Sequence, residues 1–192
     1  SNRQGNRIIL LVITSDKGLC GAFSSSILRK TMQVVRENEG KEISFLVAGR
    51  KGRDFLRNRK FNILHEYTNW AKEFDYLKAA EIGDILSELF INNAADKIYV
   101  IYNEFKSVMQ QQVIMEQLLP VVPEKTTGKD APVDYIYEPD EESILDHLLK
   151  RYMTVEVFRA FLESAAGEQG ARMTAMDNAT RNASEMIGEL TL

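Results

Sequence analysis

The 192-residue chain contains one cysteine, two histidines and four prolines, and each of these low counts excludes a class of protein. Cys20 has no second cysteine with which to form an intramolecular disulfide. Cys20, His65 and His147 lack the spacing of a zinc site. The low proline content, with 44% hydrophobic and 27% charged residues, excludes collagen-like and intrinsically disordered chains. We therefore expect a globular protein that holds neither a metal nor a cofactor.

Long apolar runs and an excess of positive charge are also missing. No apolar run approaches the ~20 residues that a membrane-spanning helix needs. The chain contains 24 Lys and Arg residues and 28 Asp and Glu residues, which gives a formal net charge of −4. This balance provides no overall attraction to nucleic acid or to anionic membranes. We expect no nucleic-acid binding, and one domain with or without an appendage.

Apolar strands alternate with amphipathic helices along the first two thirds of the chain. Residues 8–13 (IILLVI) predict a central strand that is buried on both faces. Further expected strands are residues 43–48, 61–67 and 97–102, and expected helices are residues 23–40, 50–60 and 76–90. Residues 112–119 fit a fifth strand or a helix, and residues 134–137 fit a last edge strand. The alternation predicts an α/β fold with a Rossmann-like, mostly parallel layered sheet of five to six strands.

The last part of the chain has a different pattern. From Asp140 onward there is no strand pattern and no proline, which predicts one long helix. We therefore divide the chain into an α/β domain at residues 7–138, a long helix at residues 140–192, and a flexible or cloning-derived terminus at residues 1–6. Each glycine inside a helix costs up to ~1 kcal/mol, so an interruption is expected near residues 167–170.

A heptad seam runs along the second half of this helix. Steps of four and three residues from Leu162 reach Ala166, Gln169, Met173, Met176, Thr180, Ala183, Ile187 and Leu190. Such a seam needs a partner helix at close range, and residues 1–139 offer no helix of that length. The partner is expected in another chain or in a segment that precedes residue 1. Without it, the seam is expected to be mobile or to pair with a second copy of the chain.

Two segments resemble the γ subunit of F-type ATP synthase. They are residues 14–25 (TSDKGLCGAFSS) and residues 171–187 (ARMTAMDNATRNASEMI), the latter preceded by Glu168 and Gln169. Shorter similar stretches, GRKGRDF, EQLLP and DYIYEP, extend the resemblance over nearly the whole chain. It implies an α/β foot on a rotor shaft, with a C-terminal helix that forms an antiparallel coiled coil with an N-terminal helix. That N-terminal helix and the family's C-terminal tip are missing here, so we expect a central fragment.

The resemblance also implies a function. It predicts a non-catalytic central-stalk rotor subunit that couples proton-driven rotation of the c-ring to conformational cycling of the α3β3 head. The implied partners are the α, β, ε and c-ring subunits, and the implied location is the cytoplasmic face of a bacterial inner membrane, favoured over the matrix side of a mitochondrial one. The candidate contacts with the c-ring or ε are Tyr135, Glu138, Arg50, Lys51 and Arg53. The candidate seam and head-facing residues are Arg172, Met173, Met176, Thr180, Ala183, Ile187 and Leu190.

Other interpretations of two features remain open. Residues 15–21 follow a strand and precede a helix, as a phosphate-binding turn does, so the alternative function is a small α/β nucleotide- or phosphate-binding enzyme that uses Asp16 and Lys17. Gly18 and Gly21 lie too close together for either common glycine motif, and Cys20 has no recognisable base, so a tight turn with a structural thiol is favoured. The cations of residues 50–60 form a solvated face or a partner-facing one.

Overall fold

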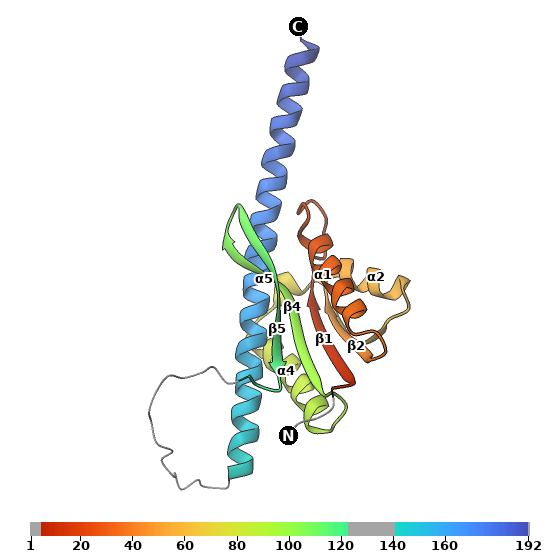
Figure 1. The fold of residues 1–192 in the computed structure, drawn as a ribbon. Helices are drawn as coiled ribbons and strands as arrows, with labels where there is room; N and C mark the ends of the chain where they lie inside the picture. Colours follow the sequence, from red (N-terminus) through yellow and green to blue (C-terminus); the bar gives the residue numbers. More distant parts are fainter. Residues whose placement is uncertain (1–4, 123–140, 192) are drawn as a thin grey trace, which may run out of the picture.

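The structure, a computed structural model, describes residues 5–122 and 141–191. A five-stranded sheet is covered by helices, and one long helix crosses the sheet and continues far beyond it (Figure 1). The strands are β1 (Arg7–Ile13), β2 (Glu42–Ala48), β3 (Asn62–Tyr67), β4 (Lys97–Ser107) and β5 (Gln110–Leu119). The helices are α1 (Phe23–Glu37), α2 (Arg50–Asn58), α3 (Trp70–Glu73), α4 (Tyr76–Ile91) and α5 (Glu141–Leu190).

The sheet has the strand order β3-β2-β1-β4-β5. The first four strands of that order are parallel, and β5 pairs antiparallel with β4. Strand β1 is central because every side chain from Ile8 to Ile13 is at most 2% exposed, and only a strand covered on both faces can bury a continuous apolar run. The predicted α/β fold is confirmed with five strands, and residues 112–119 belong to a strand. The sixth strand proposed at residues 134–137 lies outside the described residues.

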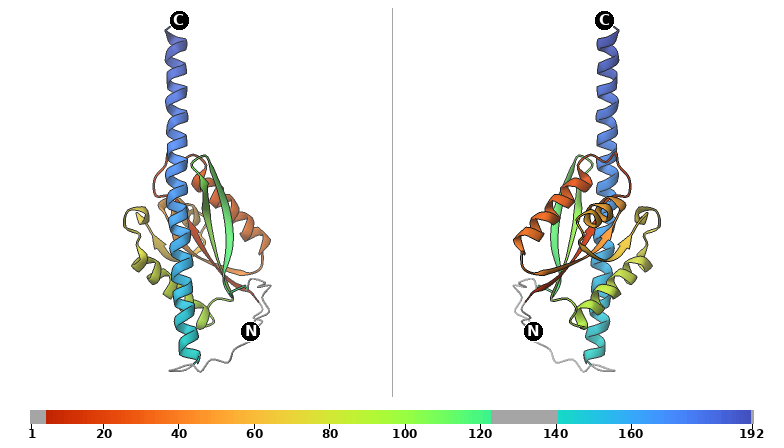
Figure 2. Two further views of the ribbon diagram at one scale, coloured as in Figure 1. Left: turned by 90° about the vertical axis from the view of Figure 1, so that its left-hand side faces the viewer. Right: turned by 90° about the vertical axis from the view of Figure 1, so that its right-hand side faces the viewer.

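Successive side chains of β1 point into two separate cores, as the pleat of a strand requires. Leu10 and Val12 pack with residues of α1 and α2, among them Ile27 and Leu56. Leu11 and the other odd-numbered residues pack on the opposite face with α4 and α5. Figure 2 shows α1 and α5 on opposite sides of the sheet. The long helix therefore builds one of the two hydrophobic cores.

Helix α5 is continuous over 50 residues, so the interruption expected near residues 167–170 is wrong. The two glycines there differ in their surroundings. A Cβ atom on Gly167 would lie 3.5 Å from the ring of Phe23, an ordinary contact, whereas one on Gly170 would lie 3.0 Å from Nε2 of Gln111. Gly83 of α4 is closely packed like Gly170, since a Cβ atom there would lie 3.0 Å from the backbone nitrogen of Thr154.

The carboxyl end of β1 is tied to the elements beside it through Thr14. Its hydroxyl donates to the carbonyl oxygen of Ala48 at 2.8 Å and accepts from the backbone nitrogen of Gly52 at 2.9 Å. The indole of Trp70 donates to the carbonyl oxygen of Thr14, also at 2.9 Å. The turns after β1, β2 and β3 are thereby held together at one edge of the sheet.

Candidate functional site

Helix α5 has two parts that differ in their surroundings. Up to Gly170 it lies against the sheet and α4, and beyond Ala175 every described residue is exposed (Figure 1). Beyond Ala175 the helix projects from the domain, and at 1.5 Å per residue the 15 residues from Met176 to Leu190 extend about 22 Å. The projecting part is the natural candidate for a contact with another polypeptide.

Eight of the nine large apolar side chains that are exposed on the described part of α5 lie in a heptad pattern, and Met186 is the exception. Leu148, Val155, Leu162, Met176 and Leu190 are separated by multiples of seven residues, and so are Leu145, Met173 and Ile187. These eight side chains, which we call the α5 seam, are between 46% and 84% exposed. The sequence predicts the part of the seam from Leu162 onward, and the structure extends it back to Leu145. Thr180 and Ala183 of the predicted seam are exposed as well.

The opposite face of α5 anchors the helix to the domain with aromatic rings. Phe161 is fully buried, and its ring stacks on Phe74 with centroids 4.0 Å apart. The indole of Trp70 packs edge-on against Phe161 at 5.1 Å. Burying aromatic side chains of this size contributes several kcal/mol, so this cluster fixes the helix to the turns at the carboxyl edge of the sheet.

A charged network borders the same helix near β5. Arg159 donates to Glu116 of β5 at 2.8 Å and to Glu156 of its own helix at 2.6 Å, and its guanidinium lies 3.7 Å from Glu163. It also donates to the hydroxyl of Tyr102, and burial raises the pKa of that tyrosine above its ordinary value. The spacing of residues 156, 159 and 163 was a visible sequence signal for the helical part of this network. The partner on β5, 43 residues away, was not predictable from spacing.

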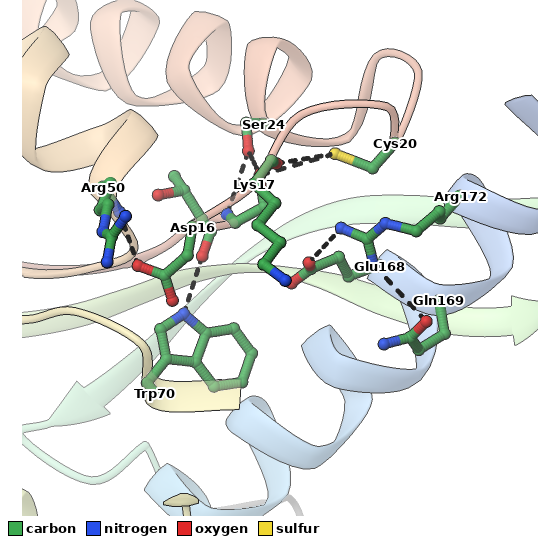
Figure 3. A network of polar contacts seen from close by, with 11 residues as sticks. Asp16, Lys17, Cys20, Ser24, Arg50, Trp70, Glu168, Gln169 and Arg172 are labelled. Atoms are coloured by element: carbon green, nitrogen blue, oxygen red, sulfur yellow. Dashed lines mark hydrogen bonds and ion pairs between the residues drawn. The ribbon is translucent and has the colours of Figure 1, made fainter. Parts of the chain in front are cut away.

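A second charged group joins α5 to the turn after β1 (Figure 3). Arg172 donates to Glu168 at 2.7 Å, and the Glu168 side chain is only 7% exposed. These two residues, with Asp16 and Lys17 of the turn, line one surface hollow. Arg172, predicted to face a partner, is thus engaged within its own helix, while Met173 and Met176 beside it are exposed.

Several polar groups of residues 15–21 form hydrogen bonds inside the protein, although Oδ2 of Asp16 is buried without a partner among the described residues. Oγ of Ser15 donates to the carbonyl oxygen of Lys17 at 2.9 Å and lies 2.7 Å from Oγ of Ser24. Asp16 accepts from the backbone nitrogen of Arg50 at 3.1 Å. Cys20 is buried, and its thiol faces Ser15 with no histidine beside it. The turn therefore has the bonding of a structural turn, which does not favour the alternative enzyme function.

The predicted basic cluster lies on and just after α2. Arg53 pairs with Asp54 at 2.9 Å, and Arg57 pairs with Glu66 at 2.7 Å. The side chain of Arg50 donates to the amide oxygen of Asn69 at 2.8 Å. These partners within the chain reduce the charge available to another molecule. The remaining two predicted contacts, Tyr135 and Glu138, lie outside the described residues.

Neither a membrane-spanning helix nor a metal-ion site is present in residues 5–122 and 141–191. No helix in these ranges is long and apolar enough to cross a bilayer. The same ranges contain no cluster of three or more histidine, cysteine or carboxylate side chains that could hold a metal ion.

Known proteins are similar to this chain in sequence and in fold. The family model described as ATP synthase matches residues 1–192. The ATP synthase gamma chain of Geotalea uraniireducens (strain Rf4) is 44% identical over 192 residues, which cover 99% of this chain and 67% of the relative. The corresponding chain of Chlorobaculum parvum is 39% identical, with 97% and 66% covered. The chain thus spans about two thirds of the length of these relatives.

Solved structures agree with the sequence relatives. A chain in the central stalk and c-ring structure of the Tetrahymena thermophila mitochondrial ATP synthase has a TM-score of 0.76 and 30% identity, with 94% of this chain and 79% of that chain covered. A chain in the rotor of the Euglena gracilis enzyme has a TM-score of 0.71 at 16% identity, covers 96% and 71%, and shows the fold alone. With its sheet, its projecting helix and its sequence all matched, the chain belongs to the ATP synthase gamma chain family and is a non-catalytic rotor subunit of the central stalk.

Proposed function

We propose that this chain transmits rotation of a c-ring to the α3β3 head, with its α/β foot attached on the ring side and α5 entering the head. The observation that carries this proposal is the α5 seam, because it continues from the packed part of the helix into the projecting part. A helix that belongs to the core of the foot and also to the shaft passes torque without a flexible joint.

The attachment of α5 to the foot is suited to this task. Twisting the shaft against the foot would have to shear the Phe161 cluster, which is close-packed and has little free volume. It would also have to break the ion pairs of Arg159, which reach both α5 and β5. Packed rings and charged pairs at successive turns of one helix resist rotation better than either would at a single point.

The seam defines the partner that the shaft requires. We propose that a helix covers it, as the heptad spacing requires, and that this helix runs antiparallel to α5, as the resemblance to the γ subunit implies. Gln169 and Thr180 interrupt the apolar positions, and polar residues at such positions fix the register of paired helices at some cost in stability. Each partner helix would then have one preferred alignment along α5.

The finer assignments follow from this placement. We propose α, β, ε and the c-ring as partners, with Arg172 and the projecting seam on the side of the head. Arg50, Lys51 and Arg53, together with Tyr135 and Glu138, are proposed to face ε or the ring. The chain would lie on the cytoplasmic face of a bacterial inner membrane, bound to it only through the ring.

Seam substitutions in an assembled complex test the proposal. The chain is expressed with the N- and C-terminal segments of a full-length relative, together with α, β and ε subunits and the membrane sector. Assembly is measured by gel filtration, and activity by ATP hydrolysis and hydrolysis-driven proton pumping in vesicles. The double variant Met176→Asp/Ile187→Asp is expected to reduce the yield of assembled complex at least tenfold, because it places two charges in an apolar helix pair. The matched control is Asn182→Asp, an exposed substitution on the same part of α5.

The control is expected to assemble as the parent chain does. Normal assembly and coupled hydrolysis with the double variant would overturn the proposed role of the seam. A complex that assembles but no longer couples hydrolysis to proton pumping would assign the seam to transmission rather than to assembly, which also supports the proposal.

A further inference from the structure

The surface hollow between α5 and the turn after β1 contains a buried carboxylate with one unbonded oxygen (Figure 3). Glu168 lines this hollow of about 330 Å³ and is only 5% exposed. Its Oε1 accepts from Arg172 at 2.7 Å, whereas its Oε2 has no hydrogen-bond partner in residues 5–122 and 141–191. A buried acceptor without a donor is costly, most of all when it is charged. A donor from outside these residues would remove that cost.

Asp16, on the turn side of the same hollow, has a similar arrangement. Its Oδ1 accepts from the backbone nitrogen of Arg50 at 3.1 Å, and its Oδ2 is buried without a partner among the described residues. Two elements that are far apart in the sequence thus each bring one unbonded carboxylate oxygen to the hollow. Carboxylate oxygens only accept hydrogen bonds, and their charge favours a cationic donor.

The cations of the foot do not supply this donor. Lys17 and Lys72 also line the hollow, but neither ammonium forms an ion pair with a described residue. Both side chains are exposed, so water and salt screen their charges. Arg172 already donates to the other oxygen of Glu168. The unbonded oxygen is therefore available to a cation of a partner.

The hollow opens beside the α5 seam. Gln169 lines the hollow and is exposed, and it lies seven residues from both Leu162 and Met176 of the seam. A helix that covers the seam has to pass over Gln169, and thus over the mouth of the hollow. A long side chain on that helix can enter the hollow from above.

The pattern of unbonded oxygens favours lysine over arginine. A guanidinium binds a carboxylate best through two parallel N–H bonds, one to each oxygen. One oxygen of Glu168 and one of Asp16 already have donors, so neither carboxylate can accept such a pair. The ammonium of lysine is a compact charge with three donors, which suits a single unbonded oxygen.

We propose that a lysine of the helix that covers the α5 seam enters this hollow and donates to Oε2 of Glu168, with Asp16 as a second negative charge beside it. The buried ion pair then fixes the register of the covering helix at Gln169, where α5 leaves the foot. This placement rests on the proposed covering of the seam, and it adds the chemistry of the covering helix at one position.

A lysine scan in the full-length chain tests the proposal. The chain carries the N- and C-terminal segments of a full-length relative, and each lysine of the N-terminal segment is replaced in turn by methionine, alone and together with Glu168→Gln. The unfolding equilibrium constant is measured in urea. At one position methionine is expected to raise this constant at least tenfold in the parent and less than threefold beside Glu168→Gln, because removing one partner of a buried pair leaves the other charge unpaired.

Asp177→Asn is the matched control. Asp177 pairs with Arg181 at the same four-residue spacing as Glu168 with Arg172, but its side chain is 75% exposed. The lysine identified by the scan should keep its tenfold effect beside Asp177→Asn. The absence of any lysine that couples to Glu168 would overturn the proposal. Coupling of Glu168 to Lys17→Met instead, or coupling that depends on protein concentration, would assign the donor to the foot itself or to a second copy, and would also overturn it.

A measurement without substitutions decides the matter even if Glu168→Gln does not fold. In the full-length chain, one lysine of the N-terminal segment should react with acetic anhydride at least tenfold more slowly than the others, as followed by mass spectrometry. Equal rates for all of them would overturn the proposal. The seam variant Met176→Asp/Ile187→Asp separates the two proposals. If it impairs assembly while no lysine couples to Glu168, only the lysine contact fails, and if it has no effect, the covered seam fails as well.

Discussion

At the scale of single residues, some buried polar groups of the foot form hydrogen bonds, and others have no partner among the described residues. The hydroxyl of Tyr67, at the end of β3, is buried and has no hydrogen-bond partner among the described residues. Burial, and to a smaller extent the charge of Glu81, raises its pKa to about 12. A phenol with a raised pKa is neutral in the folded protein at a pH at which the unfolded chain already ionises it.

This residue gives a pH-dependent prediction. Below pH 10 the neutral hydroxyl is compatible with folding, and between pH 10 and about 12 the unfolded chain loses its proton first, so stability falls as the pH rises. Two pKa units correspond to about 2.7 kcal/mol, which is an upper bound because the side chain of Tyr67 is only partly buried. The variant Tyr67→Phe should equal or exceed the parent in urea-unfolding free energy at pH 7, because it removes a buried hydroxyl without a partner. It should lose less stability than the parent between pH 10 and 12, and an unchanged alkaline slope would contradict the assignment.

At the scale of secondary-structure elements, the sequence pattern predicted an element correctly where the burial of that element is visible in its own residues. The run IILLVI identifies β1 because a strand covered on both faces needs no polar side chain. Residues 112–119 were ambiguous because their strand character comes from pairing with β4, which no local pattern encodes. Likewise, the seam was predictable beyond Leu162, where α5 has one apolar face. It was missed between Leu145 and Val155, where the opposite face is also apolar because it packs on α4.

The packing of α5 gives a prediction on matched glycines. Alanine at Gly167 meets its nearest neighbour at 3.5 Å, an ordinary contact, so Gly167→Ala should stabilise the protein by up to about 1 kcal/mol through helix propensity. Alanine at Gly83 of α4 meets the backbone of α5 at 3.0 Å, so Gly83→Ala should destabilise by about 1 kcal/mol or more despite the same propensity gain. Urea unfolding of the two variants measures both effects. Opposite signs are expected, and stabilisation by both variants would show that α4 and α5 are not closely packed.

For the whole molecule, the boundary near Gly170 separates a packed foot from an uncovered shaft. Residues of α5 such as Met153, Val157 and Phe161 contribute to the core, whereas every described residue beyond Ala175 is exposed. An isolated helix of this length is marginal in water, so the projecting part gains stability mainly by pairing.

Hydrogen exchange of the chain alone should report this boundary. Amides between Met153 and Gly170 are expected to exchange slowly at every protein concentration, because their opening requires disruption of the core. Amides between Met173 and Leu190 should exchange rapidly in dilute protein and more slowly as the concentration rises, since two copies can cover each other's seam. Slow exchange that does not depend on concentration in the second range would contradict an unpartnered seam.

The continuity of α5 sets the angle between the foot and the shaft. Each residue added to a helix turns everything beyond it by about 100°. A one-residue insertion between Gly170 and Met173 would thus leave both parts folded but rotate the apolar stripe of the shaft by more than a quarter turn relative to the sheet. Only length changes near whole heptads would preserve the alignment. The number of residues in this helix therefore fixes the angle between the apolar stripe of the shaft and the sheet of the foot.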